Sequence, residues 1–577
     1  MQHALTDDTR TTAGFLLEGL TEIGVDYLFC NMGTDHAPII EELARRREQG
    51  EKAPQVIRCP HENTAAHMAA GYALVTGRGQ GVLVHVDVGT ANASMAMHNL
   101  FRSRLPVLLM AGKAPFTSAG ELPGTRDNYV HYIQEPFDQG SLVRPFVKWE
   151  WTLPSGIVVK EALRRAQALM QSEPRGPVYL MLPRETLAEP WPIDRVKSYP
   201  EAQFGAIAPT GADPRQLDTV AERLLAAEHP ILITSFGGRN RRTSAAIERL
   251  ARLAGIRVFE SNPVNNISHE GPNFCGFQPG GSIQAADVGL LVDTDVPWFS
   301  RDVRPHARTF WAQVDVDALK AASPMWSFPA NARIQGDSAR ILEQLAEALE
   351  ARSTPAFAGA VDARNARIAA ENEQRRHKAR DKAADPGTPG QINPHFLFAE
   401  LGKRLRPEDM VFNEAVRNSP ALMEQLTRPL PGTLVRVGGG GLGASGAMAL
   451  GARLADPDLM AVQVVGDGSL YFNIPSSVLA VSSFYGLPIL TLVVDNAGWS
   501  AVKESTLRVY PDGSARRQDA YEAELPGNAD FAKLGEAFGA HGERVDDPAQ
   551  VGAALDRCIQ AVKAGRSAVL HAKVVRI

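Results

Sequence analysis

Two apolar segments in the C-terminal half of the chain end in polar residues that could bind a metal ion. Residues 461–469 read Ala-Val-Gln-Val-Val-Gly-Asp-Gly-Ser, and residues 490–496 read Leu-Thr-Leu-Val-Val-Asp-Asn. Both segments have the composition of buried β-strands, and the stretch between them is long enough for a strand–helix–strand crossover. Because the carboxyl ends of parallel strands meet at one rim of a sheet, we expect Asp467 and Asn496 to face the same point.

The atoms that these side chains present are hard oxygen ligands. An Asp carboxylate, an Asn carbonyl and a nearby main-chain carbonyl suit Mg²⁺, which takes its remaining ligands from phosphates and water. Gly466, Gly468 and Ser469 would leave backbone amides at a helix N-terminus, where a diphosphate binds readily. A plain Gly-Asp-Gly turn between strand and helix is the alternative interpretation of that tripeptide alone.

These residues need elements to position them, and short β-rich runs alternate with longer helical patterns along the chain. Such alternation is typical of parallel α/β sheets. In the first third we expect helices at residues 11–23 and 63–76 and strands at residues 25–29, 55–59, 81–86, 107–111 and 178–182. Later strands are expected at residues 229–236, 255–260, 288–293, 309–314, 410–413, 433–437, 460–465, 489–495 and 568–575.

We therefore predict an α/β fold made of three doubly wound parallel-sheet domains. A chain of 577 residues is too long for one hydrophobic core, since such cores stop growing near ~250–300 residues. The expected domains are residues 1–190, 200–350 and 394–577. Residues 351–393 are rich in Ala, Arg, Glu and Lys, which indicates a solvated helix and linker.

Composition excludes several classes of protein. The formal net charge is -5, and no basic stripe with interleaved aromatic residues is present, so we expect no nucleic-acid partner. The 4 cysteines are scattered, which argues against a disulfide framework or a zinc site. The first residues lack the apolar stretch of a signal peptide, and no uncharged run reaches the ~18–20 residues of a membrane span. We expect a cytoplasmic protein without membrane contact.

The Gly-Asp-Gly motif, followed after a crossover by a strand that ends in Asn, resembles the fingerprint of thiamine-diphosphate-dependent enzymes. The branch that it resembles is the acetolactate synthase and benzoylformate decarboxylase superfamily. The resemblance implies thiamine diphosphate and Mg²⁺ as cofactors, with Asp467, Asn496 and the carbonyl of Gly498 as metal ligands. The usual strand ending in this family is Asn-Asn, so Asp495 is a departure, and its role stays open.

Two further stretches match cofactor-binding segments of that family. Residues 436–443 read Arg-Val-Gly-Gly-Gly-Gly-Leu-Gly and form what we term the glycine-rich loop. The resemblance implies that Leu442 wedges the cofactor into its bent shape and that the carbonyl of Gly440 accepts a bond from the aminopyrimidine. Asn418 and Ser419 match the stretch that contacts the diphosphate. An ordinary strand-to-helix turn is the alternative for the glycine-rich loop.

The resemblance implies that the N-terminal domain binds the pyrimidine and the C-terminal domain the diphosphate and metal. Residues 59–67 read Cys-Pro-His-Glu-Asn-Thr-Ala-Ala-His, and Glu62 matches the carboxylate that bonds the aminopyrimidine ring nitrogen. A carboxylate in an apolar setting has a raised pKa, which suits this proton relay. Outside this motif, a Glu at a helix start would simply stabilise the helix dipole.

Two N-terminal segments resemble the benzoylformate decarboxylase branch in particular. Residues 30–34 read Cys-Asn-Met-Gly-Thr and match an Asn-Pro-Gly-Ser loop, with Thr34 in place of the serine. His85 and Asn92 match the His-x-x-x-Gly-Thr-x-Asn segment, so His85 is a candidate for proton transfer to substrate and Asn92 for cofactor contact. His36 is a further catalytic candidate. A strand-end histidine bonded to nearby backbone is the alternative for His85.

The implied activity is non-oxidative cleavage or formation of a carbon–carbon bond next to a carbonyl, by a 2-oxo-acid decarboxylase or carboligase. A 2-hydroxyacyl-CoA lyase is the alternative if the glycines and arginines of residues 234–242 hold an ADP moiety, although a turn and a wet helix face explain them as well. Two rival interpretations are a flavin-dependent oxidase and a non-catalytic cofactor-binding subunit. Expected substrates are 2-oxo acids, 2-hydroxyacyl compounds or aldehydes. Because relatives place the site between subunits, a homodimer or homotetramer is expected.

Overall fold

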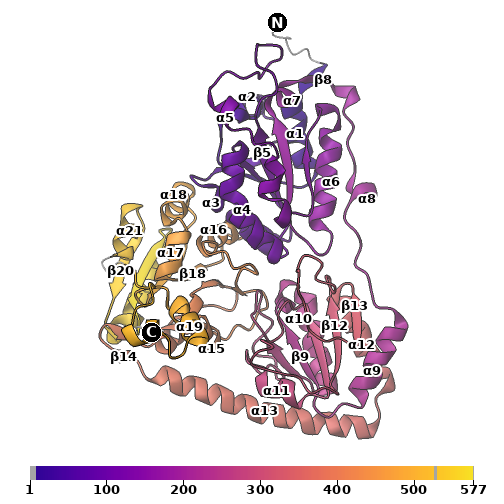
Figure 1. Cartoon of the computed structure of the whole chain (residues 1–577), viewed down its shortest axis with the longest axis vertical. Coiled ribbons are helices and arrows are strands. Elements are labelled where there is room, and N and C mark those ends of the chain that lie inside the picture. The colour runs from indigo at the N-terminus through magenta and orange to yellow at the C-terminus, as the bar shows by residue number, and fades with distance from the viewer. Residues whose placement is uncertain (1–7, 526–528, 576–577) are drawn as a thin grey trace.

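The computed structural model of the chain describes residues 8–525 and 529–575. Three parallel sheets follow one another along the chain, and each lies in its own lobe (Figure 1). The predicted α/β fold with three parallel-sheet domains is therefore confirmed. Within the described part of the chain, no helix is both long and apolar enough to span a membrane.

The N-terminal sheet has six parallel strands in the order β3-β2-β4-β5-β7-β6. The strands are β2 (Tyr27–Cys30), β3 (Gln55–Arg58), β4 (Gln80–Val84), β5 (Val107–Lys113), β6 (Glu150–Thr152) and β7 (Val178–Pro183). Helices cover both faces: α1 (Thr12–Glu22) and α6 (Val159–Gln171) on one side, α3 (Glu62–Thr76) and α4 (Val86–Arg102) on the other. Side chains alternate between these faces, as strand geometry requires: Leu28 and Leu108 join the first core, Phe29 and Leu109 the second.

The C-terminal sheet repeats this architecture with six strands in the order β17-β16-β18-β19-β21-β20. The strands are β16 (Met410–Glu414), β17 (Leu434–Val435), β18 (Ala461–Gly466), β19 (Leu490–Asp495), β20 (His541–Val545) and β21 (Ala568–Lys573). The helices around it are α14 (Pro394–Gly402), α15 (Ser419–Gln425), α16 (Ser445–Ala455), α17 (Asp467–Phe472), α18 (Pro475–Tyr485), α19 (Ser500–Val509), α21 (Phe531–Ala537) and α22 (Val551–Lys563). The central strand β19 is buried along its whole length and β18 at every residue except Gly466, which explains their continuous apolar sequence.

One hydrophobic core joins the N-terminal and C-terminal domains. It contains residues of α3 and α4 together with residues of α16 and α18. α3 and α16 cross at two glycines: a Cβ on Gly71 would overlap the carbonyl oxygen of Met448, and a Cβ on Gly451 would overlap that of Met68. The two helices are thus in backbone contact, and this contact fixes how the two domains meet.

The middle domain has five parallel strands in the order β10-β9-β11-β12-β13. These are β9 (Ile231–Thr234), β10 (Arg257–Glu260), β11 (Val288–Val292), β12 (Phe310–Asp315) and β13 (Ala332–Gln335), with α9 (Pro214–Leu225), α10 (Arg241–Ala254) and α12 (Ser338–Arg352) around them. The 30-residue helix α13 (Pro355–Ala384) leads from this domain to the C-terminal one along the lower edge of Figure 1. Its Arg364 donates to the carbonyls of Ala227 and Ala254, so the first half of α13 is bound to the middle domain.

In the three large sheets, the strands that the sequence prediction missed all lie at an edge. β6, β13 and β20 are the outermost strands of their sheets on one side. Each is short and mixes polar with apolar residues, because an edge strand is only partly buried. The long apolar runs that the prediction relied on are the central strands, whose positions it gave to within a few residues.

Candidate functional site

The carboxyl rim of the C-terminal sheet holds Asp467 and Asn496. β18 ends at Gly466 and Asp467 is the first residue of α17, while Asn496 directly follows β19. The two strands are parallel, hydrogen-bonded neighbours, so their ends share one rim, as the spacing predicts. Both side chains are buried.

Oxygen atoms converge at this rim. The side-chain amide of Asn496 puts one of its two polar atoms 2.9 Å from the carbonyl oxygen of Gly498 and 3.2 Å from Asp467 Oδ1. Where that atom is the amide nitrogen, it donates to both oxygens, and the amide oxygen accepts from Ser500 Oγ at 3.2 Å. Where it is the amide oxygen, three oxygens face one another, and a cation is needed to balance them. The donor set therefore fits a hard cation.

Asp467 and Asp495 are neighbouring buried carboxylates in different electrostatic states. Burial, and then the charge of Asp495, raises the pKa of Asp467 to about 6. Burial alone would also raise the pKa of Asp495, but hydrogen bonds from His571 and Lys573 outweigh it and lower this pKa to about 2. His571 Nε2 lies 2.7 Å from Asp495 Oδ2, and Lys573 Nζ pairs with the same oxygen. Asp495 is thus neutralised by its own partners, whereas Asp467 has no cationic side chain beside it among the described residues.

The loop after β19 is held in one conformation. Asp495 Oδ1 accepts from the N–H of Ala497 at 2.9 Å. Gly498 has a φ of +151°, and a Cβ there would overlap the carbonyl oxygen of Ala523. Trp499 N–H donates to that same oxygen at 2.7 Å. Glycine is therefore required at position 498, and the carbonyl that faces Asn496 is fixed in place.

A cavity of about 310 Å³ opens beside these oxygens. Its lining comes from residues 415–417, Leu442, residues 466–469, Phe472, Asn496 and residues 498–502. Next to this lining, the buried Nδ2 of Asn418 has no hydrogen-bond partner. No side chain caps the first turn of α17, where the sequence places Gly468 and Ser469. Unsatisfied buried donors call for an acceptor ligand, and an anion beside the oxygen cluster would provide one.

The glycine-rich loop is held by side chains of both domains. Asn99 of α4 accepts from the N–H of Gly441 at 3.1 Å and donates to its carbonyl at 2.9 Å. Asn63 of α3 donates to the carbonyl of Gly443 at 2.9 Å, and Glu414 accepts from the N–H of Gly443 at 2.6 Å. The residue between these two glycines is thereby fixed from both sides.

That residue is Leu442, and its side chain lines the cavity. Gly440 is exposed, and a Cβ there would meet no atom within 4 Å, so the backbone at this position is open to a ligand. Ser419 Oγ accepts from Asn413 Nδ2 at 2.7 Å. Of the residues predicted to touch a diphosphate, Asn418 thus has a free donor and Ser419 already has a partner.

Glu62 is the first residue of α3 and is 7% exposed. Its Oε2 accepts from Asn92 Nδ2 at 3.1 Å. The sequence predicts that Asn92 contacts the cofactor, and in the structure it contacts this carboxylate. His61 Nδ1 lies 3.8 Å from the same oxygen. Glu62 is thus held at the helix start by polar neighbours from two helices.

The other predicted N-terminal residues gather around one loop. Thr34 is exposed, and its Oγ1 lies 3.3 Å from Nε2 of His131. His85 immediately precedes α4, is partly exposed and contacts Asp35 through Nδ1. His36 is fully buried. In this structure His36 therefore lies behind Asp35 and has no access to a substrate, while Thr34 and His85 have access.

The predicted residues form two groups on two domains. No residue that lines the cavity beside Asp467 comes from the described part of the N-terminal domain. Glu62, Thr34 and His85 lie on the N-terminal domain and take no part in that cavity. Within one chain, the cavity beside Asp467 is therefore lined by candidate metal and diphosphate ligands, but not by the candidate acid–base residues Glu62, Thr34 and His85.

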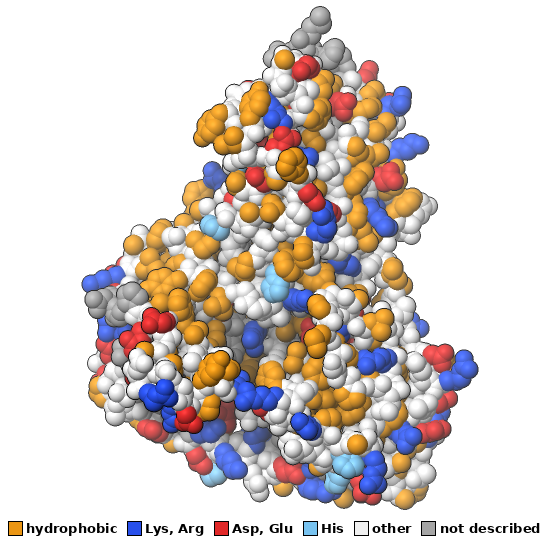
Figure 2. Space-filling model, in the orientation of Figure 1, with side chains coloured by type: hydrophobic (Ala, Val, Ile, Leu, Met, Phe, Trp, Pro, Cys, Tyr) orange, Lys and Arg blue, Asp and Glu red, His pale blue; other side chains and the backbone are white. Residues whose placement is uncertain are grey.

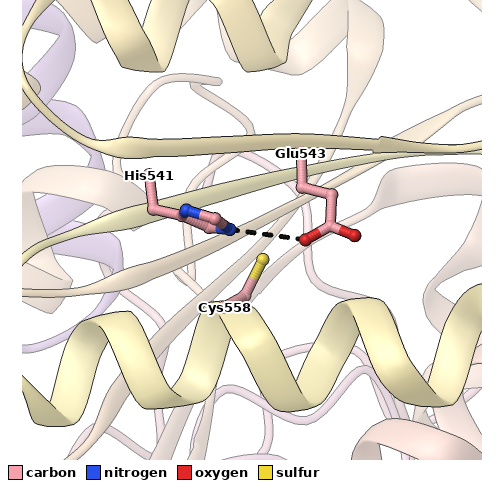
Figure 3. A group of neighbouring side chains, drawn as sticks. All are labelled: His541, Glu543 and Cys558. Carbon is pink, nitrogen blue, oxygen red and sulfur yellow. Dashed lines mark hydrogen bonds and ion pairs between the residues drawn. The ribbon is translucent and has the colours of Figure 1, made fainter.

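A different set of metal-ligating residue types lies between β20 and α22 (Figure 3). His541 Nε2 lies 3.3 Å from Glu543 Oε2, and both lie near Cys558. Arg557 already pairs with Glu543. Burial raises the pKa of the Cys558 thiol to about 12, so this thiol stays protonated at neutral pH. Lacking both a free carboxylate and a thiolate, this group is a poorer cation site than the oxygen cluster.

Three residues with clear positioning roles escaped the sequence prediction. Asn99 and Glu414 hold the glycine-rich loop, and no local pattern marks them because their partners are far away in the chain. Asp35 carried a signal, since it lies between two predicted residues on the same loop. Its contact with His85 could have been inferred from that position.

Comparison with known proteins agrees with this geometry. Residues 10–142 match the N-terminal TPP binding domain of thiamine pyrophosphate enzymes, and residues 419–572 match their C-terminal TPP binding domain. The chain is 24% identical over 538 residues to benzoylformate decarboxylase of Pseudomonas aeruginosa, covering 92% of this chain and 93% of that protein. It is 24% identical over 524 residues to acetolactate synthase isozyme 3 large subunit of Escherichia coli, covering 88% and 85%.

Solved structures share the whole fold. The thiamine diphosphate-dependent 4-hydroxybenzoylformate decarboxylase of Rhodococcus jostii superposes with a TM-score of 0.76 at 20% identity, covering 98% of this chain and 100% of that one. Benzoylformate decarboxylase of Polynucleobacter necessarius superposes with a TM-score of 0.77 at 17% identity, covering 98% and 99%. At these sequence identities, the structural similarity is evidence for the fold alone.

The two matched domains and the three-sheet fold define the class: the chain belongs to the thiamine pyrophosphate enzymes, thiamine pyrophosphate being another name for thiamine diphosphate. Within that family its likeness is to the decarboxylase and acetolactate synthase type.

Proposed function

We propose that the protein uses thiamine diphosphate and Mg²⁺ to break or form a carbon–carbon bond next to a carbonyl, acting as a 2-oxo-acid decarboxylase or carboligase. The observation that carries this proposal is the convergence of Asp467 Oδ1, the Asn496 amide and the Gly498 carbonyl beside a cavity. A hard cation that also ligates a diphosphate would satisfy this oxygen set.

The residues present divide the work of holding the cofactor. Asp467, Asn496 and the Gly498 carbonyl would hold Mg²⁺. The free Nδ2 of Asn418 and the first amides of α17, from Gly468 and Ser469, would receive the diphosphate. The unpaired, buried Nδ2 of Asn418 beside the oxygen cluster supports the assignment.

The chemistry on the substrate needs an electron sink and a proton. When bound, thiamine diphosphate supplies the sink for the electron pair left when the bond next to the carbonyl breaks. Glu62 would hold a proton at the ring nitrogen of the aminopyrimidine. His85 would deliver a proton to the former carbonyl carbon or its oxygen, since it is partly exposed and its pKa is raised by the hydrogen bond to Asp35. Leu442 would support the cofactor from below, as its place in the cavity wall suggests.

For a 2-oxo acid, the bond that breaks joins the carboxylate to the carbonyl carbon. Carbon dioxide leaves, and a proton takes its place, which gives an aldehyde. If a second carbonyl compound reacts instead of the proton, the product is a 2-hydroxyketone. Similarity to a benzoylformate decarboxylase over 92% of the chain favours 2-oxo acids as substrates.

The experiment is turnover with defined substrates. The protein, reconstituted with thiamine diphosphate and Mg²⁺, is incubated with aliphatic and aromatic 2-oxo acids, and carbon dioxide and products are followed by NMR. We expect cofactor-dependent release of carbon dioxide, and the product then separates aldehyde formation from ligation. Glu62→Gln is the control variant and should fold but lose about 10²–10⁴-fold in kcat. No release from any acid, with cofactor bound, would contradict the decarboxylase proposal.

We also propose that the working unit is at least a homodimer, because the acid–base group of one chain must meet the cavity of another. Exposed apolar side chains support this. Around the N-terminal group they include Phe116, Leu122, Tyr129, Tyr132, Ile133 and Phe137, and around the cavity Tyr471, Phe472, Trp499 and Val502. Hydrophobic side chains stand out from the upper lobe in Figure 2, which is the N-terminal domain in this view. Apolar clusters of this kind are typical of protein interfaces.

A further inference from the structure

Asp35 is a fully buried carboxylate, and the proposed function uses only its effect on the pKa of His85. It lies in the short 3₁₀ turn of residues 34–36 and is 0% exposed. Its Oδ1 contacts Nδ1 of His85, and its Oδ2 accepts from the N–H of Val86 at 3.4 Å. Its Oδ2 also lies 3.2 Å from Nε2 of His36. An ionised carboxylate is costly to bury without such partners, so the arrangement around Asp35 has to be accounted for.

The backbone leaves room for this contact at two glycines. A Cβ on Gly112 would overlap the carboxylate of Asp35, and a Cβ on Gly33 would overlap the imidazole of His85. The carboxylate and the imidazole therefore occupy space that any other residue at positions 33 or 112 would fill. The pair is built into the fold of β5 and the loop after β2.

The hydrogen bonds assign the protons. The N–H of Gly33 donates to His36 Nδ1 at 3.0 Å, so this nitrogen carries no proton and His36 is neutral, with its hydrogen on Nε2. That nitrogen lies 3.2 Å from Asp35 Oδ2 but makes no hydrogen bond to it. Burial lowers the pKa of His36, which keeps it neutral. For Asp35, burial alone would raise the pKa, and since His36 is neutral, the hydrogen bond and the charge of His85 are what oppose it and lower the pKa. The charge of Asp35 therefore falls on His85.

The imidazole ring of His85 is consequently held by a hydrogen bond on one side. Its Nδ1–H donates to Asp35, and Nε2 lies on the opposite edge of the ring. The hydrogen bond to Asp35 comes first among the causes that raise the pKa of His85, against burial, and Gln134 and Asp87 add to it. The other titratable and charged groups nearby are His36, His131, Arg184 and Asp127. His36 and His131 interact electrostatically with both Asp35 and His85, whereas Arg184 and Asp127 pair with each other.

We propose that Asp35 is a positioning residue: it fixes the imidazole of His85 so that Nε2 is the nitrogen that exchanges a proton with the substrate. The step that His85 performs rests on the proposed function, but the Asp35–His85 coupling does not. A carboxylate that orients a histidine in this way sets both its tautomer and the pH range in which it is charged. The test can therefore be made on the histidine itself.

The measurement is the pH dependence of histidine carbethoxylation by diethylpyrocarbonate in the full-length protein, read by mass spectrometry. Trypsin releases residues 79–102 as one peptide, which contains both His85 and His98, so His98 is an internal reference. The pKa of His98 is lowered by burial. In the wild type the modification of His85 should therefore rise at higher pH than that of His98. The opposite order would overturn the proposal without any variant.

Asp35→Asn keeps the shape of the side chain and removes its charge. We expect the His85 profile to move to lower pH, so that at pH ~6 His85 reacts roughly 3- to 10-fold faster relative to His98. The comparison variant is Asp87→Asn, which removes a carboxylate that accepts from the N–H of Val88 at 2.8 Å and raises the pKa of His85 less than Asp35 does. It should move the His85 profile in the same direction but by a smaller amount. An unchanged His85 profile in folded Asp35→Asn, checked by circular dichroism, would refute the coupling.

Turnover gives a second readout. Asp35→Asn should lower kcat by about 10-fold or more, which is part of the ~10²–10⁴-fold that a positioned acid–base group supplies. In a His85→Gln background the same change should cost no further activity, because the two residues act through one proton. Additive losses would show that Asp35 acts by another route. If no 2-oxo acid is turned over, the carbethoxylation result still decides whether Asp35 controls His85.

Discussion

Asp467 is the residue on which the proposed metal site depends most, because its carboxylate has no cationic side chain beside it among the described residues. We predict that Asp467→Asn retains its fold but holds cofactor at least ~10-fold more weakly in the presence of Mg²⁺. Cofactor retained after dialysis, measured against total protein, checks this. Asp512→Asn, at an exposed carboxylate whose side chain is 93% accessible, is the control. Equal retention in the two variants would remove Asp467 from the metal site.

Asp495 takes the position where the related family usually has a first Asn, and its partners explain the difference. Lys573 and His571 pair with it from β21. We predict that Asp495→Asn lowers the free energy of unfolding by about 1–3 kcal/mol, because Lys573 is left without its partner in a largely buried place. Thermal unfolding measures the loss. The double variant Asp495→Asn/Lys573→Met should recover part of it, and a double variant as unstable as the sum of the singles would contradict this explanation.

For single residues, spatial proximity could be predicted from the sequence where the residues follow the ends of adjacent strands. Asp467 and Asn496 could be placed together because parallel strands share a rim. Asn99 could not be linked to Gly441, because the two are 342 positions apart and only the packing of α4 against the C-terminal domain brings them together. His36 was a reasonable candidate by sequence, but whether a loop histidine faces outward or inward depends on the tertiary fold.

Among the elements, α3 carries a buried histidine, His67, that contacts Asn99, the residue that holds the glycine-rich loop. His67 is fully buried, lies 3.1 Å from the carbonyl of Asn63 through Nδ1, and lies 3.2 Å from Asn99 Nδ2 through Nε2. Since Nε2 accepts from Asn99, a protonated ring would place two donors against each other. Burial, opposed by the bond to Asn63, lowers the pKa of His67 from 6.5 to about 4.

This pKa predicts a pH dependence of stability. His67 binds a proton more weakly in the folded than in the unfolded chain, so its contribution is complete above pH ~6.5 and is lost as the pH falls toward ~4. The loss attributable to His67 should reach about 3 kcal/mol. Unfolding monitored between these pH values should show a shallower decline for His67→Gln than for the wild type. Parallel curves for the two proteins would contradict the assignment.

The crossing of α3 and α16 predicts a steric effect. Gly71→Ala puts a methyl group into the carbonyl oxygen of Met448, and we expect a loss of about 2 kcal/mol or more. Gly359→Ala is the matched control, because Gly359 lies inside α13 and a Cβ there meets nothing within 4 Å. That change should stabilise the protein by about 0.5–1 kcal/mol through helix propensity. The order of the two thermal unfolding temperatures checks the prediction.

Strands were easier to predict from the sequence the more deeply they are buried. Central strands such as β18 and β19 are buried on both faces and stand out as apolar runs. The edge strand β20, with the sequence His-Gly-Glu-Arg-Val, resembles a loop because its polar residues face solvent. The helix boundaries near Thr11 and Glu62 were accessible because capping residues mark them.

On the scale of the whole molecule, the middle domain carries paired charges at the carboxyl rim of its sheet, where open α/β sheets bind nucleotides. The carboxyl ends of β11 and β12 carry Asp293 and Asp315, and Arg104 from the N-terminal domain pairs with Asp315 at 3.0 Å. Lys320 pairs with Asp315 at 2.7 Å. Asp315 is thus paired within the chain at this rim, which weighs against the acyl-CoA lyase alternative.

The proposed homodimer predicts complementation between two inactive variants. If Glu62 of one subunit acts with Asp467 of the other, a mixed dimer of Glu62→Gln and Asp467→Asn has one site with both changes and one intact site. Random reassociation should then restore about a quarter of wild-type activity. Either variant reassociated alone is the control. No recovery on mixing would mean that both residues must come from the same chain.

Helix α13 has a mechanical consequence for this assembly. At ~1.5 Å per residue, its 30 residues form a rod of about 45 Å, anchored to the middle domain through Arg364 and to the C-terminal domain through the pairing of Lys382 with Glu424 at 2.8 Å. A rod fixed at both ends passes on torque as well as tension. A tilt of the middle domain would therefore be transmitted to the C-terminal sheet through α13.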